Sequence, residues 1–233
     1  MKKAVFMILL LVSVFANAQK DVTKFLGIPV DGNKSEMKKK LIAKGFSYNA
    51  QGDFLEGEFN GRDVQLFIAT NNNKVWRIMV CDANSCDETD IKIRFNKLCD
   101  QFSRNKKYIA AHMGEGDYTI SESEDISYEM RIRNKRYEAA YFQVPDTNLI
   151  DSLSYLQKIK EVLLQNFTEE QLKNPSKELI EKIEQLEIKE YVDITFDLIK
   201  NKSVWFLINE NYGRYFISIF YDNEYNHSDG EDL

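Results

Sequence analysis

The stretch FLEGEFNGRDVQLFIATNNNKVWRIMVC, residues 54–81, decides the fold class. It holds three apolar-rich runs, at residues 54–59, 64–69 and 75–81, separated by Asn60-Gly61 and by the Asn triplet 71–73. Asn and Gly tolerate the positive φ angles of tight hairpin turns, and short apolar-rich runs between such turns are typical of β-strands. The stretch therefore predicts three antiparallel strands joined in a meander.

Helices are predicted on both sides of this meander. Upstream, Asn33 begins a capping box, and Met37 and Leu41 mark the apolar face of a short helix. Downstream, residues 85–88 offer a second capping box before apolar residues that recur at helical spacing over 87–105. The first part of the chain is thus expected to form a helix, a meander and a second helix.

The rest of the chain is predicted to repeat this plan twice. Strand-like runs lie at residues 118–121, 126–133 and 137–144 and again at 192–198, 204–208 and 215–221. A helical stretch over 146–189, broken near Asn174-Pro175, lies between the two sets. Residues 204–208 are apolar on both faces, and residues 215–221 are nearly so, with Ser218 as the exception.

These patterns predict an α+β protein with antiparallel β-meanders, helices packed mainly on one sheet face, and repeated units of one helix followed by three strands. Its 233 residues suit one large domain or two small ones. We expect a signal peptide at 1–18, a first α+β unit (helix, meander, helix) at 19–112, and a second α+β part at 113–233. The second part would hold two meanders separated by broken helices and end in an acidic tail.

The N-terminus has the three features of a secretory leader. Lys2 and Lys3 precede an apolar run over residues 4–15, and Ala16-Asn17-Ala18 supplies small residues for the peptidase. The run is shorter than the roughly 20 residues that cross a bilayer, so no membrane span is expected. Cleavage after Ala18 would remove two lysines and no acids, which changes the formal net charge from −6 to −8. We therefore expect an exported protein, periplasmic, on the outer surface or secreted.

Composition argues against several function classes. The 37 Asp and Glu outnumber the 31 Lys and Arg, which disfavours a nucleic-acid partner. The two histidines, His112 and His227, leave little material for histidine-based catalysis or a multi-histidine metal site. No Gly-rich phosphate loop or hydrolase motif is present in the sequence. We expect no cofactor, no metal and no enzymatic activity, with a small carboxylate-dependent hydrolase as the alternative.

The expected export decides how the three cysteines are interpreted. Cys81 and Cys86 close a short segment between a predicted strand and a predicted helix. In an oxidising compartment they would form a disulfide if their Cα atoms came within about 7 Å, and would otherwise remain free thiols. Cys99 falls on the apolar face of the helix over 87–105, so it is interpreted as a small buried residue.

Aromatic residues supply the candidate binding site. Those chosen from predicted strands and turns are Trp76, Tyr128, Tyr141, Trp205 and Tyr215. A sheet face rich in Tyr and Trp is typical of protein-binding or sugar-binding surfaces, although such residues also fill cores. If helices cover only one face, the other would bind a partner, and a protein is favoured over a glycan. The prediction is a non-catalytic binding module; besides the hydrolase, an envelope scaffold or assembly subunit is the further alternative.

Three segments carry a resemblance to known sequences. They are residues 25–32 (FLGIPVDG), 43–46 (AKGF) and the C-terminal stretch 221–233. The chain resembles, over its whole mature length, a group of secreted proteins of unknown function from Gram-negative gut anaerobes. At fold level its helix-then-meander plan resembles the tandem helix-plus-sheet modules of the β-lactamase-inhibitor-protein-like superfamily. That resemblance implies an open concave sheet that binds other proteins, and it brings no catalytic residues.

Overall fold

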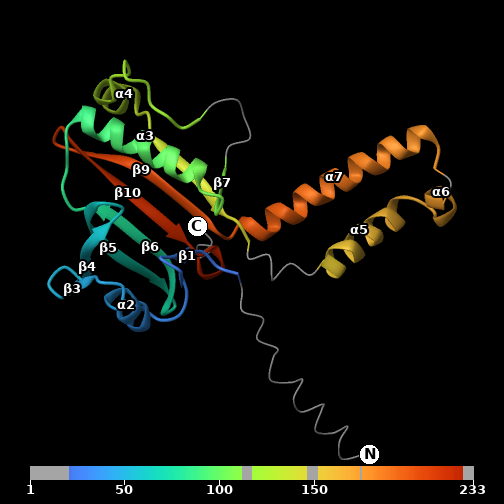
Figure 1. Cartoon of the computed structure of the whole chain (residues 1–233), viewed down its shortest axis with the longest axis horizontal. Helices are drawn as coiled ribbons and strands as arrows, with labels where there is room; N and C mark the ends of the chain where they lie inside the picture. The colour runs from blue at the N-terminus through green and yellow to red at the C-terminus, as the bar shows by residue number, and fades with distance from the viewer. Residues whose placement is uncertain (1–20, 112–116, 146–151, 174, 228–233) are drawn as a thin grey trace, which may run out of the picture.

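The computed structural model describes residues 21–111, 117–145, 152–173 and 175–227, so the predicted signal peptide at 1–18 lies outside the described residues. The α+β class with an antiparallel sheet is confirmed (Figure 1). Ten strands form a two-stranded hairpin, β1-β2, and an eight-stranded sheet in the order β3-β4-β5-β6-β10-β9-β8-β7. The strands are β1 Lys24–Phe25, β2 Ile28–Pro29, β3 Ser47–Asn49, β4 Phe54–Phe59, β5 Arg62–Asn71, β6 Lys74–Asp82, β7 Tyr108–Ala110, β8 Glu138–Gln143, β9 Ser203–Asn211 and β10 Arg214–Asp222. The helices are α2 Lys34–Ile42, α3 Glu88–Arg104, α4 Ile126–Arg133, α5 Ser152–Asn166, α6 Glu169–Lys173, α7 Lys177–Ile199 and the short 3-10 helix η2 Glu224–Asn226.

The first helix and meander form as predicted. Asn33 caps α2 by accepting a hydrogen bond from the backbone N–H of Glu36 at 2.9 Å. Between β4 and β5, Asn60 and Gly61 take φ angles of 53° and 72°, which is the left-handed conformation that a two-residue hairpin needs. The meander then leads into α3, whose N-cap is Asp87.

The predicted strand at 126–133 is wrong, because this segment is helix α4. Asp125 accepts from the backbone N–H of Tyr128 and so starts the helix. Ile126 is buried and Met130 packs against the core, while Tyr128 and Ile132 are exposed. The pair at i and i+4 thus decided the structure, although the same residues also alternate at strand spacing. Residues 118–121 are not a strand either.

The predicted strand at 192–198 is also wrong, since it forms the last turns of α7. Ser176 caps this helix, and no Gly or Pro interrupts residues 177–199. Once a helix has been nucleated, adding a further turn costs little free energy. The helix that begins in the Glu-rich upstream segment therefore extends through residues 192–198, although several of them are β-branched. The predicted repeat of one helix followed by three strands is therefore not found: α2 is followed by the four strands β3, β4, β5 and β6, and the two later units do not form.

The eight-stranded sheet contains strands from both predicted units. β6 pairs with β10 through Ile78↔Tyr221 and Val80↔Ile219, and β7 pairs with β8. The segments on either side of residue 112 therefore share one sheet and one hydrophobic core.

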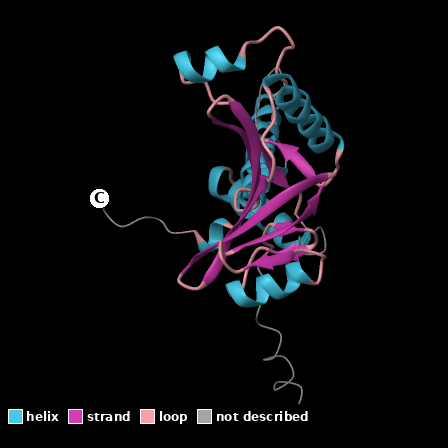
Figure 2. Ribbon diagram, turned by 90° about the vertical axis from the view of Figure 1, so that its left-hand side faces the viewer, coloured by secondary structure: helices cyan, strands magenta, loops and turns pink. Residues whose placement is uncertain are grey.

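One face of the sheet carries the core. Val64, Leu66, Val80, Phe206 and Ile219 lie on that face and are at most 1% exposed. The apolar sides of α2, α3 and α4 belong to the same buried cluster, so the three helices cover this face. The strands above them are strongly twisted (Figure 2).

Helices α5 and α7 form a hairpin that projects from the end of the sheet (Figure 1). The predicted break in this helical region is confirmed, and Thr168 and Gln171 form a reciprocal capping box at the start of α6. The ring of Phe196 on α7 meets Phe142 of β8 edge-on, with centroids 6.2 Å apart.

Candidate functional site

The second face of the sheet is lined by apolar side chains that the described helices leave half-buried. We call it the open face; its central residues are Phe54, Phe67, Met79, Phe142, Trp205, Leu207, Phe216 and Phe220. They alternate along the strands with the residues of the core, and the cross-strand register places them side by side. Phe54 and Phe67, for example, have ring centroids 5.4 Å apart.

The centre of the open face is an ordered aromatic cluster. Trp205 and Phe220 stack across β9 and β10 with centroids 4.0 Å apart and planes at 15°. The Arg77 guanidinium lies 4.2 Å from the Trp76 ring and 4.9 Å from the Phe220 ring. These distances are typical of cation–π contacts, which restrict the motion of long arginine side chains.

A buried carboxylate holds this cluster in place. Asp222 is 2% exposed and accepts from Arg77 Nε at 2.6 Å and Nη2 at 2.7 Å. Trp205 Nε1 donates to the same carboxylate at 2.8 Å. The Arg77 guanidinium and the Trp205 indole N–H therefore both donate to one carboxylate, which fixes the orientation of the rings in the cluster.

A β-bulge places Trp76 beside Arg77. The register between β5 and β6 shifts at Ala69/Thr70, which leaves Trp76 as the extra residue on β6. The Trp76 ring is also met edge-on by His227, which follows η2, with centroids 4.7 Å apart. The end of the described chain thus covers one margin of the open face.

The structure separates the five aromatic residues predicted as a site. Trp76 and Trp205 both lie in the cluster on the open face. Tyr141 and Tyr215 are 1% and 2% exposed in the core, so their prediction as binding residues is wrong. They occupy the alternate strand positions that face the helices. Tyr128 is 48% exposed on α4, which lies on the helix-covered side.

Several open-face residues were not singled out from the sequence. Met79, Leu207 and Phe220 project to this face, and Arg77 organises it. The available signal was that residues 204–208 and 215–221 are apolar on both faces. Strands of that kind need cover on both sides. Among the described helices, α2, α3 and α4 cover one side, whereas on the other side α7 contacts Phe142 and His227, after η2, contacts Trp76.

The three cysteines are free thiols. Cys81 is opposite Ser218 on β10, whereas Cys86 is opposite Tyr215. Three residues along a strand span about 10 Å, which exceeds the Cα separation that a disulfide allows. Burial raises the pKa of the Cys99 thiol to about 12, so this sulfur stays protonated.

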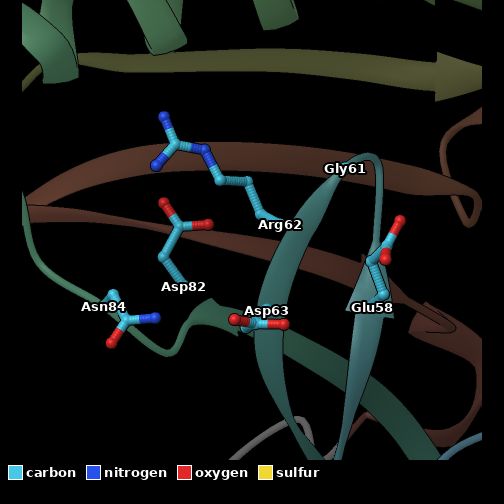
Figure 3. A pocket seen from close by; sticks show the side chains of 6 residues that line it. All are labelled: Glu58, Gly61, Arg62, Asp63, Asp82 and Asn84. Carbon is cyan, nitrogen blue, oxygen red and sulfur yellow. The ribbon is translucent and has the colours of Figure 1, made fainter.

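A small cleft of about 210 Å³ at the ends of β4, β5 and β6 is lined by three carboxylates (Figure 3). Figure 3 shows the carboxyl groups of Glu58, Asp63 and Asp82 pointing in different directions. Asp82 is paired with Arg94, which donates from Nε at 2.7 Å. A hydrolase would need two acids aimed at one point, and this arrangement does not provide them.

In the part of the chain that the structure describes, the carboxyl groups whose pKa is shifted have cationic partners. These groups are the side chains of Asp53, Glu124, Glu178, Asp197 and Glu210. A Lys or Arg donates a hydrogen bond to each carboxylate, which holds its pKa below the usual value. A general acid in hydrolysis needs the opposite shift, toward neutral pH. These five groups are therefore suited to ion pairs.

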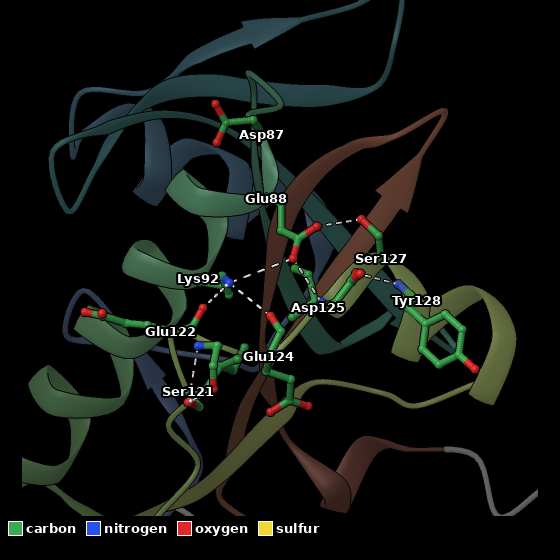
Figure 4. A network of polar contacts seen from close by, with 12 residues as sticks. Asp87, Glu88, Lys92, Ser121, Glu122, Glu124, Asp125, Ser127 and Tyr128 are labelled. Carbon is green, nitrogen blue, oxygen red and sulfur yellow. Dashed lines mark hydrogen bonds and ion pairs between the residues drawn. The ribbon is translucent and has the colours of Figure 1, made fainter.

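A polar network joins α3 to α4 (Figure 4). Glu88 accepts from Ser127 Oγ at 2.7 Å and from the first backbone N–H of α4 at 3.0 Å. Lys92 donates to the carbonyl oxygens of Glu122 and Glu124, at 2.9 and 3.0 Å. The acid and the serine of the network are bonded within the fold, which gives them a structural role in holding α4.

The side chain of Glu124 makes the stability of this region depend on pH. Lys135 and Tyr137 both donate to its carboxylate and hold its pKa below the usual 4.5. A lowered folded-state pKa stabilises the fold above pH 4.5, and the contribution is lost as pH falls through the folded value. We expect Glu124→Gln to lower the free energy of unfolding at pH 7 by about 0.5–1 kcal/mol. The gap should close toward pH 3 in urea titrations; a constant gap from pH 7 to 3 contradicts this assignment.

Together these observations define an α+β protein with one helix-covered sheet face and one open aromatic face. Comparisons with family models, curated proteins and solved structures found no match. Among the described residues, no cluster of His, Cys, Asp or Glu has a metal-binding arrangement. Within the same ranges, no helix has both the length and the apolar character needed to cross a bilayer.

Proposed function

We propose that this protein is an exported, non-catalytic binding module whose open face docks a protein partner. The observation that carries the proposal is the row of half-buried apolar side chains across the central strands, on the face opposite α2, α3 and α4. Soluble proteins rarely expose contiguous apolar surface of this kind unless it meets another molecule.

The cluster at the centre has the features of a binding hot spot. Trp and Arg are among the residue types enriched in binding hot spots. Trp205 and Arg77 are already held by Asp222, so binding would order them little further. A partner with an apolar surface would bury Leu207 and Phe216 around this cluster.

A protein partner fits the open face better than a glycan does. Sugars need exposed polar groups to pair with their hydroxyls, together with a free aromatic ring face. The Asp222 carboxylate is buried beneath Arg77 and Trp205, and Trp205 already stacks on Phe220. The surface that remains is mainly apolar.

Two matched substitutions test the proposal. Leu207→Glu places a charge on the open face, whereas Ile93→Glu makes the same kind of change on α3, where Ile93 is 62% exposed on the helix-covered side. We expect immobilised wild-type protein and Ile93→Glu to capture the same envelope protein, and Leu207→Glu to capture at least tenfold less. Thermal melts of all three must agree. Equal capture by Leu207→Glu would refute docking at this face.

A stable oligomer of the purified protein would instead favour the scaffold alternative. In that case Leu207→Glu should dissociate the oligomer if its subunits meet through the open face. Sedimentation velocity of the same three proteins separates the two results.

A further inference from the structure

A second candidate site lies at one end of the sheet, on the helix-covered side. It is a cavity of about 710 Å³, within the range of small-molecule pockets. It lies where the β1-β2 hairpin meets the ends of β4, β8 and β10 and the loop before β7. We call it the basic groove; it is lined by Lys24, Leu26, Gly27, Phe59, Asn105, Lys106, Lys107, Tyr108, Gln143, Val144, Pro145, Lys202 and Tyr221.

The charge of the basic groove is opposite to that of the whole protein. Four lysines line it and none of its described lining residues is acidic, although the chain has more acids than bases. Lys202 is buried and bonded to Asp21, so its charge is balanced. Lys106 and Lys107 are exposed on the loop before β7. The groove therefore offers a local positive potential in an acidic protein, which attracts anions.

The floor of the groove is aromatic and firmly packed. Tyr221 and Phe59 both contact the buried Phe25, with ring centroids 4.9 and 5.2 Å away. Tyr108 packs on Phe102 of α3 at 4.6 Å. These rings form an apolar surface beneath the lysines.

The wall formed by the β1-β2 hairpin is fixed by Gln143, which is 9% exposed. Its side-chain amide donates to the carbonyl of Lys24 at 2.7 Å and accepts from the backbone N–H of Lys24 at 2.8 Å. This reciprocal pair attaches the hairpin to β8. The groove is therefore bounded on this side by a rigid element.

Leu26 at the tip of this hairpin is in an unfavourable conformation. Its φ is 50°, in the left-handed region, and it is followed by Gly27 with φ 79°. Asn, Asp or Gly is preferred in such a turn, and a bulky apolar residue there is uncommon. Leu26 is also 39% exposed, so core packing does not explain its presence. It does supply an apolar wall to the groove.

We propose that the basic groove binds a small amphipathic anion. Lys106 and Lys107 pair with its carboxylate or phosphate head, and its hydrocarbon body lies between Leu26 and the floor formed by Tyr108 and Phe59. Because the groove is on the helix-covered side, this binding is independent of docking at the open face.

Calorimetric titration below the critical micelle concentration tests the proposal with three probes. Dodecanoate and dodecyl phosphate carry the two head groups, and dodecyl maltoside has the same chain with a neutral head. We expect one saturable site for at least one anionic probe and at least tenfold weaker binding of the maltoside. Equal binding of the maltoside, or no binding of either anion at millimolar concentration, overturns the proposal.

Variants locate the site. Lys106→Glu/Lys107→Glu should weaken binding of the anionic probe at least tenfold. Lys39→Glu/Lys40→Glu makes the same change in net charge at two exposed residues of α2, and should leave affinity within twofold. Leu26→Asn should weaken binding while leaving the melting temperature unchanged or higher, because Asn suits the left-handed φ. If both charge-reversal pairs weaken binding equally, the effect is general electrostatics and the site is wrong.

Discussion

Replacing Arg94 by Ala is expected to lower the free energy of unfolding by about 3–5 kcal/mol, the cost of breaking a buried ion pair by removing one partner. Arg94 on α3 and Asp82 on β6 have side chains that are 7% and 6% exposed. Asp82 also accepts from the backbone N–H of Ile217 at 3.1 Å. Without Arg94 the Asp82 carboxylate would remain buried with one weak donor. Urea denaturation at pH 7 measures the loss.

Two controls separate the buried pair from general effects of mutating α3. Arg104→Ala removes an arginine from the same helix that pairs with Asp100, but these side chains are 80% and 49% exposed. Because exposed ion pairs contribute little, this variant should be close to the wild type in stability. Asp82→Leu/Arg94→Leu should recover much of the loss, since apolar residues can replace a buried pair. A small effect of Arg94→Ala would mean that water reaches Asp82.

The fold could be predicted wherever turn chemistry and periodicity agreed. Asn60-Gly61 fixed a hairpin, and Met37 with Leu41 fixed the buried face of α2. The errors fell where the apolar residues fit two periods at once. In α4 the alternation from Ile126 to Ile132 also contains a pair at i and i+4, and only tertiary contacts decide between them.

The candidate site was harder to predict than the fold. A strand that is apolar on both faces predicts that both faces are covered by other groups, but it does not predict which face the helices cover. Trp205 and Tyr215 therefore looked equivalent in the sequence, yet one lies on the open face and the other is in the core. The bulge at Trp76 arises from the register within the β5-β6 hairpin, and the groove beside Leu26 depends on contacts between segments far apart in the sequence; the apolar pattern carries no signal for either.

Asp222→Ala is the substitution expected to disturb the open face most. It removes the shared acceptor of Arg77 and Trp205, so two donors lose their partner at a position that is 2% exposed. Arg77 retains some access to water, with a side chain 25% exposed. We therefore expect a loss of about 2–4 kcal/mol in the free energy of unfolding, at or somewhat below the range for fully buried pairs.

Asp222→Ala should weaken partner binding by more than its loss of stability alone would explain. Without the carboxylate, Arg77 no longer holds its place over Trp76 and Phe220, and the cluster loses the order that favours binding. At a temperature where Asp222→Ala is still folded, it should capture the proposed protein partner at least tenfold less well than wild type. Arg94→Ala is the matched control, because it lowers stability by a similar amount from the opposite face. If both variants lose capture equally, stability explains the effect; loss confined to Asp222→Ala assigns the binding to the open face.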